Sequence, residues 1–145
     1  MPEAYTIRVP EGPDDLKAYF AVRHDVFVLE QKVPADLEYD ELDATAVHVM
    51  AIGPDGALGA SRLLPGADGI GVLGRLAVLS KARGLGVGAA LVRAVEEQAR
   101  LLGLRVVELH AQVHALGFYE RLGYESFGEE YEEAGIAHRS MRRAL

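Results

Sequence analysis

A chain of 145 residues is about the length of one domain, and because half of its residues are apolar it can build a hydrophobic core. The absence of cysteine excludes a thiol nucleophile, a zinc–thiolate site and a disulfide framework. A net charge of −7 disfavours a nucleic-acid role, since binding the phosphate backbone needs clustered lysine and arginine. Met1–Pro10 does not resemble a secretory signal and no apolar run is long enough to span a membrane, so we expect a cytoplasmic protein with a single domain, residues 1–145.

The first third of the chain predicts a strand, a helix and an acidic loop. Tyr5–Val9 alternates as a short strand does. Asp14 or Asp15 can cap a helix whose apolar residues recur every three or four positions until about Glu30. The loop that follows is either a solvated face or a rim that attracts cationic amines. Its carboxylates begin at the end of the helix and are Glu30, Asp36, Glu38, Asp40, Glu41 and Asp43.

Three strands with short connections are expected next. They are Val47–Ile52, Leu58–Leu64 and Ile70–Leu79. The first two are separated by a turn that contains Asp55-Gly56, a strong hairpin signal. Sequential strands with such short links form an antiparallel meander.

The last part of the chain changes to alternating helices and strands. We expect a helix over Gly86–Leu102, a strand over Leu104–His110, a helix over Gln112–Leu122 and a final hairpin of Tyr124–Phe127 with Ile136–Arg142. The exposed face of the first of these helices should carry Arg93, Glu96, Glu97 and Arg100. The predicted class is α+β, with a mixed, mostly antiparallel sheet of about six or seven strands flanked by about four helices.

The glycine-rich segment Arg83–Ala89 joins the third strand of the meander to the long helix. A helix N-terminus presents unpaired N–H groups and a partial positive charge, and glycines let an anion approach them closely. Arg83 adds a permanent charge that can bind phosphate. The segment therefore predicts a pyrophosphate site; the alternative is that the glycines only permit close packing of the helix on the sheet.

A dinucleotide-binding site is a second interpretation of the same segment. Gly84, Gly86 and Ala89 satisfy the G-x-G-x-x-A pattern, and Glu108 lies at a suitable distance after it. The antiparallel meander before the glycines and the single strand–helix unit after them do not fit a Rossmann half. A Walker loop is nearly excluded, because Ala89 and Ala90 stand where it needs lysine and serine or threonine.

The segment resembles the cofactor motif of the GNAT acetyltransferase superfamily, with Arg83, Gly86 and Gly88 at its defining positions. The resemblance implies acetyl-CoA as co-substrate and transfer of its acetyl group to a primary amine. It also implies that the strand residues before the loop pair with the pantetheine arm. The implied cofactor-binding residues are Leu76, Ala77, Val78, Arg83, Gly84, Leu85, Gly86, Val87, Gly88, Ala89 and Gln112.

A second family pattern occupies the following helix, where Gln112 stands in the usual Asn position and Tyr119 in the position of a conserved tyrosine. More narrowly, the chain looks like the ElaA-type branch of the superfamily. The supporting positions are Arg23, Val26, Phe27, Glu30, Gln31, Asp40, Asp43, His48, Gly74, Arg75, Ala111, Gln112 and Gly135–His138. The branch does not identify the acceptor, which is a small molecule or a protein.

Tyr119 is the expected general acid. A phenol that titrates near pH 10 can supply a proton to a thiolate whose conjugate acid titrates near 8.5. The alternative is that Tyr119 only packs its helix against the sheet. A backbone N–H at or near Val78 is the expected oxyanion donor. The base that deprotonates the amine is not assigned, and the candidates are Glu30, His48, His110 and water.

Other polar residues allow further interpretations. Asp40, Asp43 and His48 hint at a metal, but their spacing is weak and we expect none. Arg62 and Arg75 should pair with the acidic loop or grip a substrate carboxylate. A homodimer is possible. The alternative functions are an acyl-CoA-binding module without turnover and, more remotely, a dinucleotide-dependent oxidoreductase.

Overall fold

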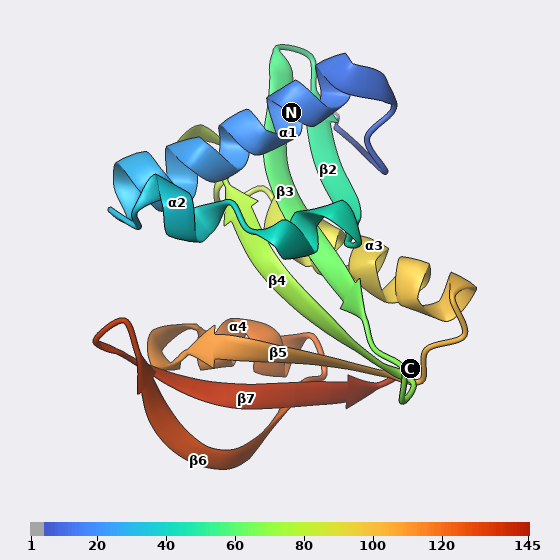
Figure 1. Ribbon diagram of the computed structural model, residues 1–145, viewed down its shortest axis with the longest axis vertical. Helices are drawn as coiled ribbons and strands as arrows, with labels where there is room; N and C mark the ends of the chain where they lie inside the picture. The colour runs from blue at the N-terminus through green and yellow to red at the C-terminus, as the bar shows by residue number, and fades with distance from the viewer. Residues whose placement is uncertain (1–4) are drawn as a thin grey trace.

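One mixed sheet with helices on both faces organises the computed structural model, which describes residues 5–145 (Figure 1). Residues 1–4, which belong to the expected domain and to the Met1–Pro10 segment, lie outside the described part. Within that part the sheet has seven strands in the order β1-β2-β3-β4-β5-β7-β6. Their bounds are β1 Thr6–Arg8, β2 Val47–Gly53, β3 Gly56–Pro65, β4 Ile70–Val78, β5 Val106–Gln112, β6 Glu125–Glu133 and β7 Ile136–Ala144.

One face of strands β2 to β4 is covered by the first helical segment. It consists of α1 (Gly12–Arg23), the π-helical turn η1 (His24–Glu30), α2 (Ala35–Glu38) and the 3₁₀ turn η2 (Glu41–Ala44). Tyr19, Val22 and Val26 project from this segment onto Met50, Ala60 and Ala77 of the sheet and form the smaller of two apolar cores. Figure 1 shows α1 and α2 in front of these strands.

The start of α1 differs from the expectation that Asp14 or Asp15 occupies the N-cap position. The helix begins at Gly12, and Glu11 occupies the N-cap position without a side-chain cap, three or four residues before the expected cap. Asp15 lies in the first turn, where its carboxylate accepts a hydrogen bond from the Glu11 N–H at 2.8 Å. The Asp15 carboxylate therefore lies within the helix and pairs with the backbone N–H that precedes it. The glutamate of a capping box reaches back to the N-cap N–H in a similar way.

The opposite face of the sheet holds the larger core. It is covered by α3 (Val87–Leu101) and by η4 (Val113–Ala115) with α4 (Leu116–Arg121). The exposed face expected for α3 is wrong at Glu96, which is 1% exposed. Its carboxylate accepts a hydrogen bond from the Tyr124 hydroxyl at 2.8 Å and pairs with Arg93 and Arg143. Periodicity could not reveal this, because Tyr124 and Arg143 lie far from Glu96 along the chain.

Strands β4 and β5 are the only parallel neighbours among the described strands, and they pair over three positions, Ile70–Val72 with Val106–Glu108. Each strand then continues for several residues without the other as a partner. Every other pair is antiparallel, so the meander is confirmed and a Rossmann half, which needs a largely parallel sheet, is excluded. The final hairpin is confirmed, and both its strands are longer than expected.

Candidate active site

The glycine-rich segment forms a loop that ends at the N-terminus of α3. After β4 the chain makes the 3₁₀ turn η3 (Ser80–Ala82), and Gly84 and Gly86 then take φ values of +83° and +81°. Only glycine adopts this left-handed conformation easily. Gly88 is different, because a side chain there would meet the Phe118 ring at 3.4 Å. Backbone conformation therefore explains the first two glycines, whereas a Cβ at Gly88 would make only ordinary van der Waals contact, so neither conformation nor packing demands glycine there.

The N-terminus of α3 has the properties of an anion site. Gly86 precedes the helix without a side-chain cap, and the first turn holds no acidic residue. The first backbone bond of the helix is donated by Ala90 to the Gly86 carbonyl at 3.0 Å, so the N–H groups of Val87, Gly88 and Ala89 come before the ladder begins. The positive end of the helix is thus left for an external acceptor.

Arg83 lies beside this helix end, and its side chain is engaged within the protein. Its two terminal nitrogens donate to the Glu30 carboxylate, each at 2.8 Å, and its Nε donates to the Val78 carbonyl at 3.0 Å. Both side chains are 44% exposed. The hydrogen bond from Arg83 lowers the pKa of Glu30. Glu30 is therefore a weak base in this arrangement, which argues against its expected candidacy.

Strand β4 has one free main-chain edge at its carboxyl end. The Leu79 N–H donates to the Leu58 carbonyl of β3 at 2.9 Å. Because main-chain groups alternate in direction along a strand, the N–H and C=O of Val78 point away from β3. They face the side where β5 no longer pairs. The Val78 N–H in the expected pantetheine strand Leu76–Val78 therefore has no partner on β3 or β5, as β-strand addition requires, whereas the Val78 C=O accepts the hydrogen bond from Arg83.

Gln112 ends β5 beside this opening, and Tyr119 follows it on α4, packed against the larger core. The Tyr119 ring packs edge-on against Phe118 with centroids 4.9 Å apart, and burial raises its pKa to about 12. Its hydroxyl makes no hydrogen bond with residues 5–145, in contrast to the hydroxyls of Tyr19 and Tyr124. Gln112 is the last residue of β5 and is half-buried. Tyr119 therefore combines a packed ring with an uncommitted proton.

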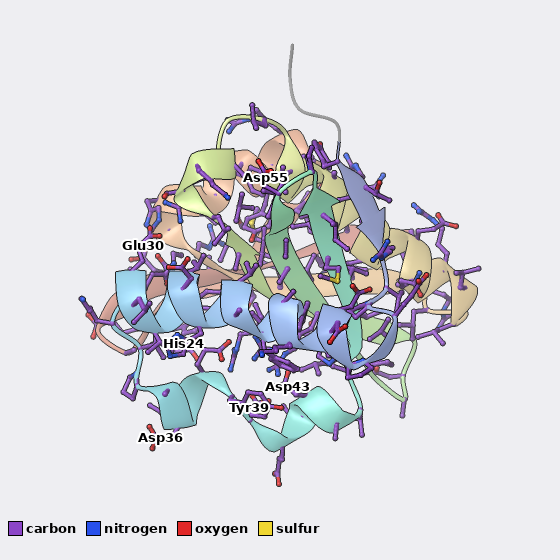
Figure 2. The ribbon with its side chains drawn as sticks, turned by 90° about the horizontal axis from the view of Figure 1, so that it is seen from above. His24, Glu30, Asp36, Tyr39, Asp43 and Asp55 are labelled. Atoms are coloured by element: carbon purple, nitrogen blue, oxygen red, sulfur yellow. The ribbon has the colours of Figure 1, made fainter. Side chains whose placement is uncertain are left out.

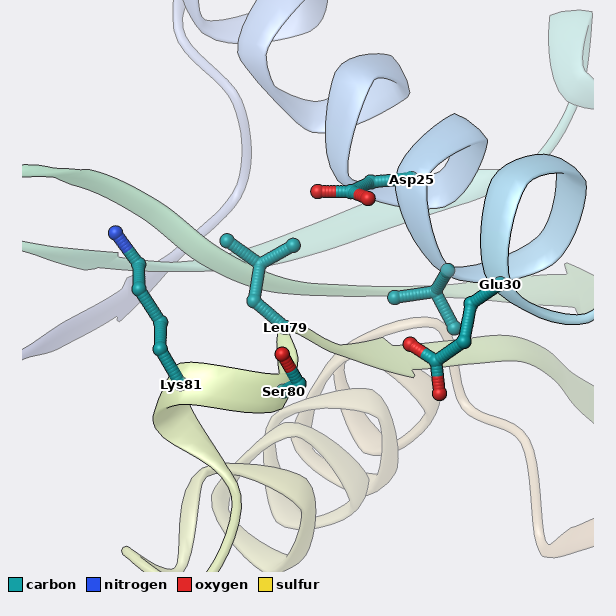
Figure 3. A pocket seen from close by; sticks show the side chains of 6 residues that line it. Asp25, Glu30, Leu79, Ser80 and Lys81 are labelled. Atoms are coloured by element: carbon teal, nitrogen blue, oxygen red, sulfur yellow. The ribbon is translucent and has the colours of Figure 1, made fainter.

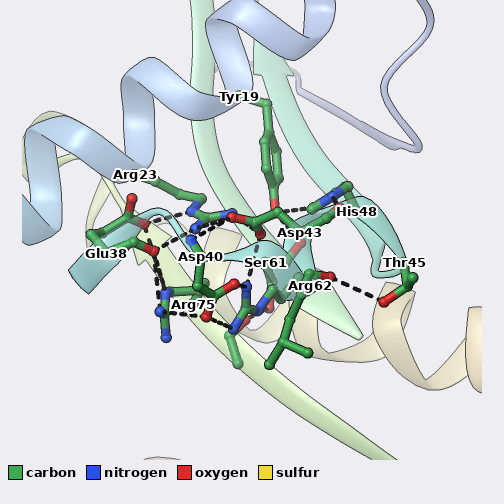
Figure 4. Close-up of polar contacts among 12 residues, drawn as sticks. Tyr19, Arg23, Glu38, Asp40, Asp43, Thr45, His48, Ser61, Arg62 and Arg75 are labelled. Atoms are coloured by element: carbon green, nitrogen blue, oxygen red, sulfur yellow. Dashed lines mark hydrogen bonds and ion pairs between the residues drawn. The ribbon is translucent and has the colours of Figure 1, made fainter. Parts of the chain in front are cut away.

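The acidic loop is only partly solvated, because Glu38 and Asp43 are 5% and 8% exposed and face a buried arginine (Figures 2 and 4). Arg23 donates to the Glu38 carboxylate at 2.6 Å and to the two Asp43 oxygens at 2.7 and 3.1 Å. Burial alone would raise the pKa of Asp43, but hydrogen bonds from Arg23 and Arg62 hold it below 3.8. Asp36, in contrast, is exposed and belongs to the solvated part of the loop.

Arg62 and Arg75 extend this network to β3 and β4, which confirms the expected pairing with the acidic loop. Arg62 donates to Asp40 and Asp43 at 2.7 and 2.8 Å. Arg75 donates to the Glu38 carbonyl at 3.1 Å and to Asp40 at 3.3 Å. The three arginines thus balance the three carboxylates of Glu38, Asp40 and Asp43, and the same carboxylates that suggested a metal are bonded to guanidinium groups.

Arg75 also marks a β-bulge in the middle of β4. Ala60 lies opposite Ala77 while Arg62 lies opposite Gly74, so two residues of β4 face one of β3. Arg75 has a φ of +53°, which a residue with a side chain adopts only when its surroundings hold it. The hydrogen bonds to Glu38 and Asp40 supply that support. The network therefore fixes the shape of β4 where its free edge begins.

The two histidines proposed as bases lie in different surroundings. His48 is bonded at both ring nitrogens, to the Tyr19 hydroxyl at 2.7 Å and to the Asp43 carbonyl at 2.9 Å, which makes it a structural residue. His110 is exposed on β5, with Nδ1 2.8 Å from the Tyr131 hydroxyl. Tyr131 was not singled out from the sequence, since its place in an acidic strand gave no sign that it meets His110.

A pocket of about 260 Å³ lies between η1 and the end of β4 (Figure 3). Its walls include Asp25 and Glu30 from the helix and Leu79, Ser80 and Lys81 from the strand end. A neighbouring hollow of about 210 Å³ shares Asp25 and Leu79 with it and is otherwise lined by small apolar side chains. The β4 end is therefore accessible from the α1 side.

A family model, curated relatives and a solved structure are similar to this chain over nearly its whole length. The acetyltransferase (GNAT) domain matches residues 17–145. The chain is 38% identical to the uncharacterised N-acetyltransferase YjcF of Bacillus subtilis, over 93% of this chain and 96% of that one. It is 33% identical to the ElaA protein of Escherichia coli, over 90% and 88% of the two chains. The structure of an acyl-CoA N-acyltransferase from Pseudomonas aeruginosa superposes with a TM-score of 0.85 at 36% identity, covering 98% of this chain and 99% of that one.

The fold and the helix-end site define an acyltransferase that uses an acyl-CoA as donor and an amine as acceptor. The chain belongs to the GNAT acetyltransferase family, with acetyl-CoA as its co-substrate. Its likeness to ElaA confirms the resemblance seen in the sequence. Among residues 5–145, no helix is long and apolar enough to cross a bilayer.

Proposed function

We propose that this chain acetylates a primary amine, with the pyrophosphate of acetyl-CoA at the N-terminus of α3 and the pantetheine arm on the free edge of β4. The supporting observation is that two separate features meet here: an uncapped helix end without acidic residues, and a strand whose outward main-chain groups lack a strand partner. A domain comprising residues 1–145 provides both. Arg83 would leave Glu30 to meet the phosphates.

The reaction needs three further groups. A backbone N–H on the free edge, at or near Val78, stabilises the oxyanion that forms when the amine attacks the thioester carbonyl. Tyr119 supplies a proton to the departing thiolate, which is supported by its uncommitted hydroxyl. Gln112 contributes an amide contact to the cofactor. Direct transfer between two bound substrates needs no covalent enzyme intermediate.

Turnover with acetyl-CoA tests this function. Release of free thiol is followed with a panel of primary amines, while calorimetry measures the affinity for CoA and for NADH. We expect thiol release that depends on the amine, together with binding of CoA and not NADH. Tight CoA binding without thiol release above background would instead indicate a binding module.

The homodimer and the cytoplasmic location remain predictions. Gel filtration with light scattering tests the homodimer, and cell fractionation tests the cytoplasmic location. The nature of the acceptor, a small molecule or a protein side chain, follows from which members of the amine panel are acetylated.

A further inference from the structure

We infer that His110 is the base that takes the proton from the acceptor amine, and that Tyr131 sets the tautomer in which it does so. The inference rests on the proposed acetyl transfer and identifies the group that the reaction still lacks. It follows from three observations: the place of His110 in the sheet, the hydrogen bond of its Nδ1, and the open space beside Gly74.

His110 lies where β4 and β5 part. The last paired residues are Val72 and Glu108, and continuing the register by two residues brings Gly74 level with His110. In parallel strands, residues at the same level project on the same face, so both belong to the face that carries α1. The strands are about 4.8 Å apart where they still pair. His110 is therefore among the first side chains on β5 to border the opening.

Gly74 leaves room on that face. A Cβ at this position would have no heavy atom within 4 Å, and its backbone does not take the left-handed conformation that would demand glycine. Gly74 directly precedes the bulge residue Arg75. A glycine that neither the turn geometry nor the packing requires is suited to a place where reacting groups approach the strand.

The hydrogen bond of His110 selects its reactive nitrogen. Nδ1 lies 2.8 Å from the Tyr131 hydroxyl and 3.4 Å from the Ser140 hydroxyl, on the side of β7 and β6. The two nitrogens of an imidazole point in different directions, so Nε2 faces away from Tyr131. Within residues 5–145, Nε2 has no hydrogen-bond partner. When Nδ1–H donates to the Tyr131 oxygen, Nε2 keeps a free lone pair.

His110 and Tyr119 carry the two protons that the reaction moves. The amine nitrogen forms a bond to the thioester carbon, the carbonyl electron pair moves to oxygen, and a proton of the amine passes to Nε2 of His110. The electron pair on the oxyanion then re-forms the carbonyl as the C–S bond breaks with its electron pair on sulfur, and the thiolate takes a proton from Tyr119. His110 returns its proton to the phenolate through solvent. The products are the N-acetylated amine and CoA with a free thiol.

Other charged groups surround His110 and enter any pH profile. Tyr131 stacks on His138, which lies 3.9 Å from a Glu133 oxygen. Glu108 and Arg142 lie opposite each other on β5 and β7, on the same face of the sheet. On the β4 side, Arg62 lies opposite Gly74 and Arg75 follows it, and both arginines are paired with Asp40. The contribution of His110 to the pH dependence of activity must therefore be identified by substitution, because the profile alone does not distinguish it from these groups.

The test compares His110→Gln with His24→Gln, an exposed histidine on η1 that makes no hydrogen bond with residues 5–145. Thiol release from acetyl-CoA is measured from pH 5.5 to 9 with spermidine, tyramine and methoxyamine, and CoA affinity is measured by calorimetry. We expect His110→Gln to lower kcat/KM about 100-fold or more with the alkylamines and to remove the acid limb of the profile. The loss should be smaller with methoxyamine, because the adduct of this weakly basic amine is more acidic and gives up its proton to water more readily. CoA affinity and the His24 variant should be unchanged.

Two further measurements address the geometry. Nitrogen-15 spectra of the CoA complex should show His110 as the Nδ1–H tautomer, and Tyr131→Phe should reduce this population and kcat/KM together. Gly74→Val should fold normally and lose acetyl transfer. Activity of His110→Gln within threefold of wild type, or an Nε2–H tautomer, would overturn the inference while leaving the acetyltransferase intact. An inactive wild type that still binds CoA would instead refute the proposed function.

Discussion

Replacing Tyr119 with phenylalanine removes one oxygen atom from the site and leaves the packing of the ring in place. Burial raises the pKa of this phenol to about 12, against about 8.5 for an ordinary thiol. Complete proton transfer to a thiolate would therefore be uphill by about 5 kcal/mol if the thiol kept its ordinary pKa. Tyr119 can help only if the thiolate is also destabilised in the site, or if the hydroxyl donates its proton as the C–S bond breaks.

We expect Tyr119→Phe to lower kcat by about 100-fold or more, with CoA affinity changed less than twofold. The phenol keeps its proton well above neutral pH, so the wild-type rate should not lose this acid below about pH 11. Any alkaline fall at lower pH belongs to another group. The assay is thiol release at saturating acetyl-CoA and amine between pH 6 and 10.5.

Tyr124→Phe is the matched control, because its hydroxyl is buried and bonded to Glu96 rather than free. This variant should lose about 1–2 kcal/mol of unfolding free energy in urea titrations and keep its kcat. If Tyr119→Phe retained more than a third of the wild-type kcat, the assignment of Tyr119 as the acid would be wrong. The same conclusion would follow if both variants lost activity equally.

Three other outcomes are expected. Arg83→Ala should weaken CoA binding about tenfold in calorimetry, more strongly at low salt, whereas Arg100→Ala at the far end of α3 should not. Arg23→Met should lower the free energy of unfolding in urea by about 3–5 kcal/mol, because it leaves buried carboxylates without their partner. The pKa of Asp43 is lowered in the folded state, so its contribution to stability is present above about pH 4 and is lost as the pH falls further. Urea midpoints at decreasing pH that stay constant below pH 4 would contradict this.

Local patterns were enough to predict the order of the elements. The meander, the long helix and the final hairpin all follow from periodicity and turn residues within the segments themselves. Bounds were less certain, since β6 and β7 are lengthened by pairing with each other and with β5. The glycine-rich loop and the helix end that follows it were predictable because the pattern lies in seven consecutive residues.

The side chains that meet across the fold were not predictable. Glu96 was placed on the exposed face of its helix, yet Tyr124 and Arg143 bring it into the core. The acidic loop was expected to be a solvated face or a rim for cationic amines, because Arg23, the partner of Asp43, lies twenty residues away on α1. Tyr131 meets His110 only because β7 lies between their strands. Such pairs depend on strand order, which no single segment encodes.

The three paired positions between β4 and β5 have a consequence for how the molecule responds to its cofactor. The sheet is divided into a four-strand part and a three-strand part that share only a short row of hydrogen bonds. A pantetheine arm on the free edge would act as a partial eighth strand between them. The amide of Val78 should then exchange its hydrogen more slowly in the CoA complex, and the two parts of the sheet should become protected together.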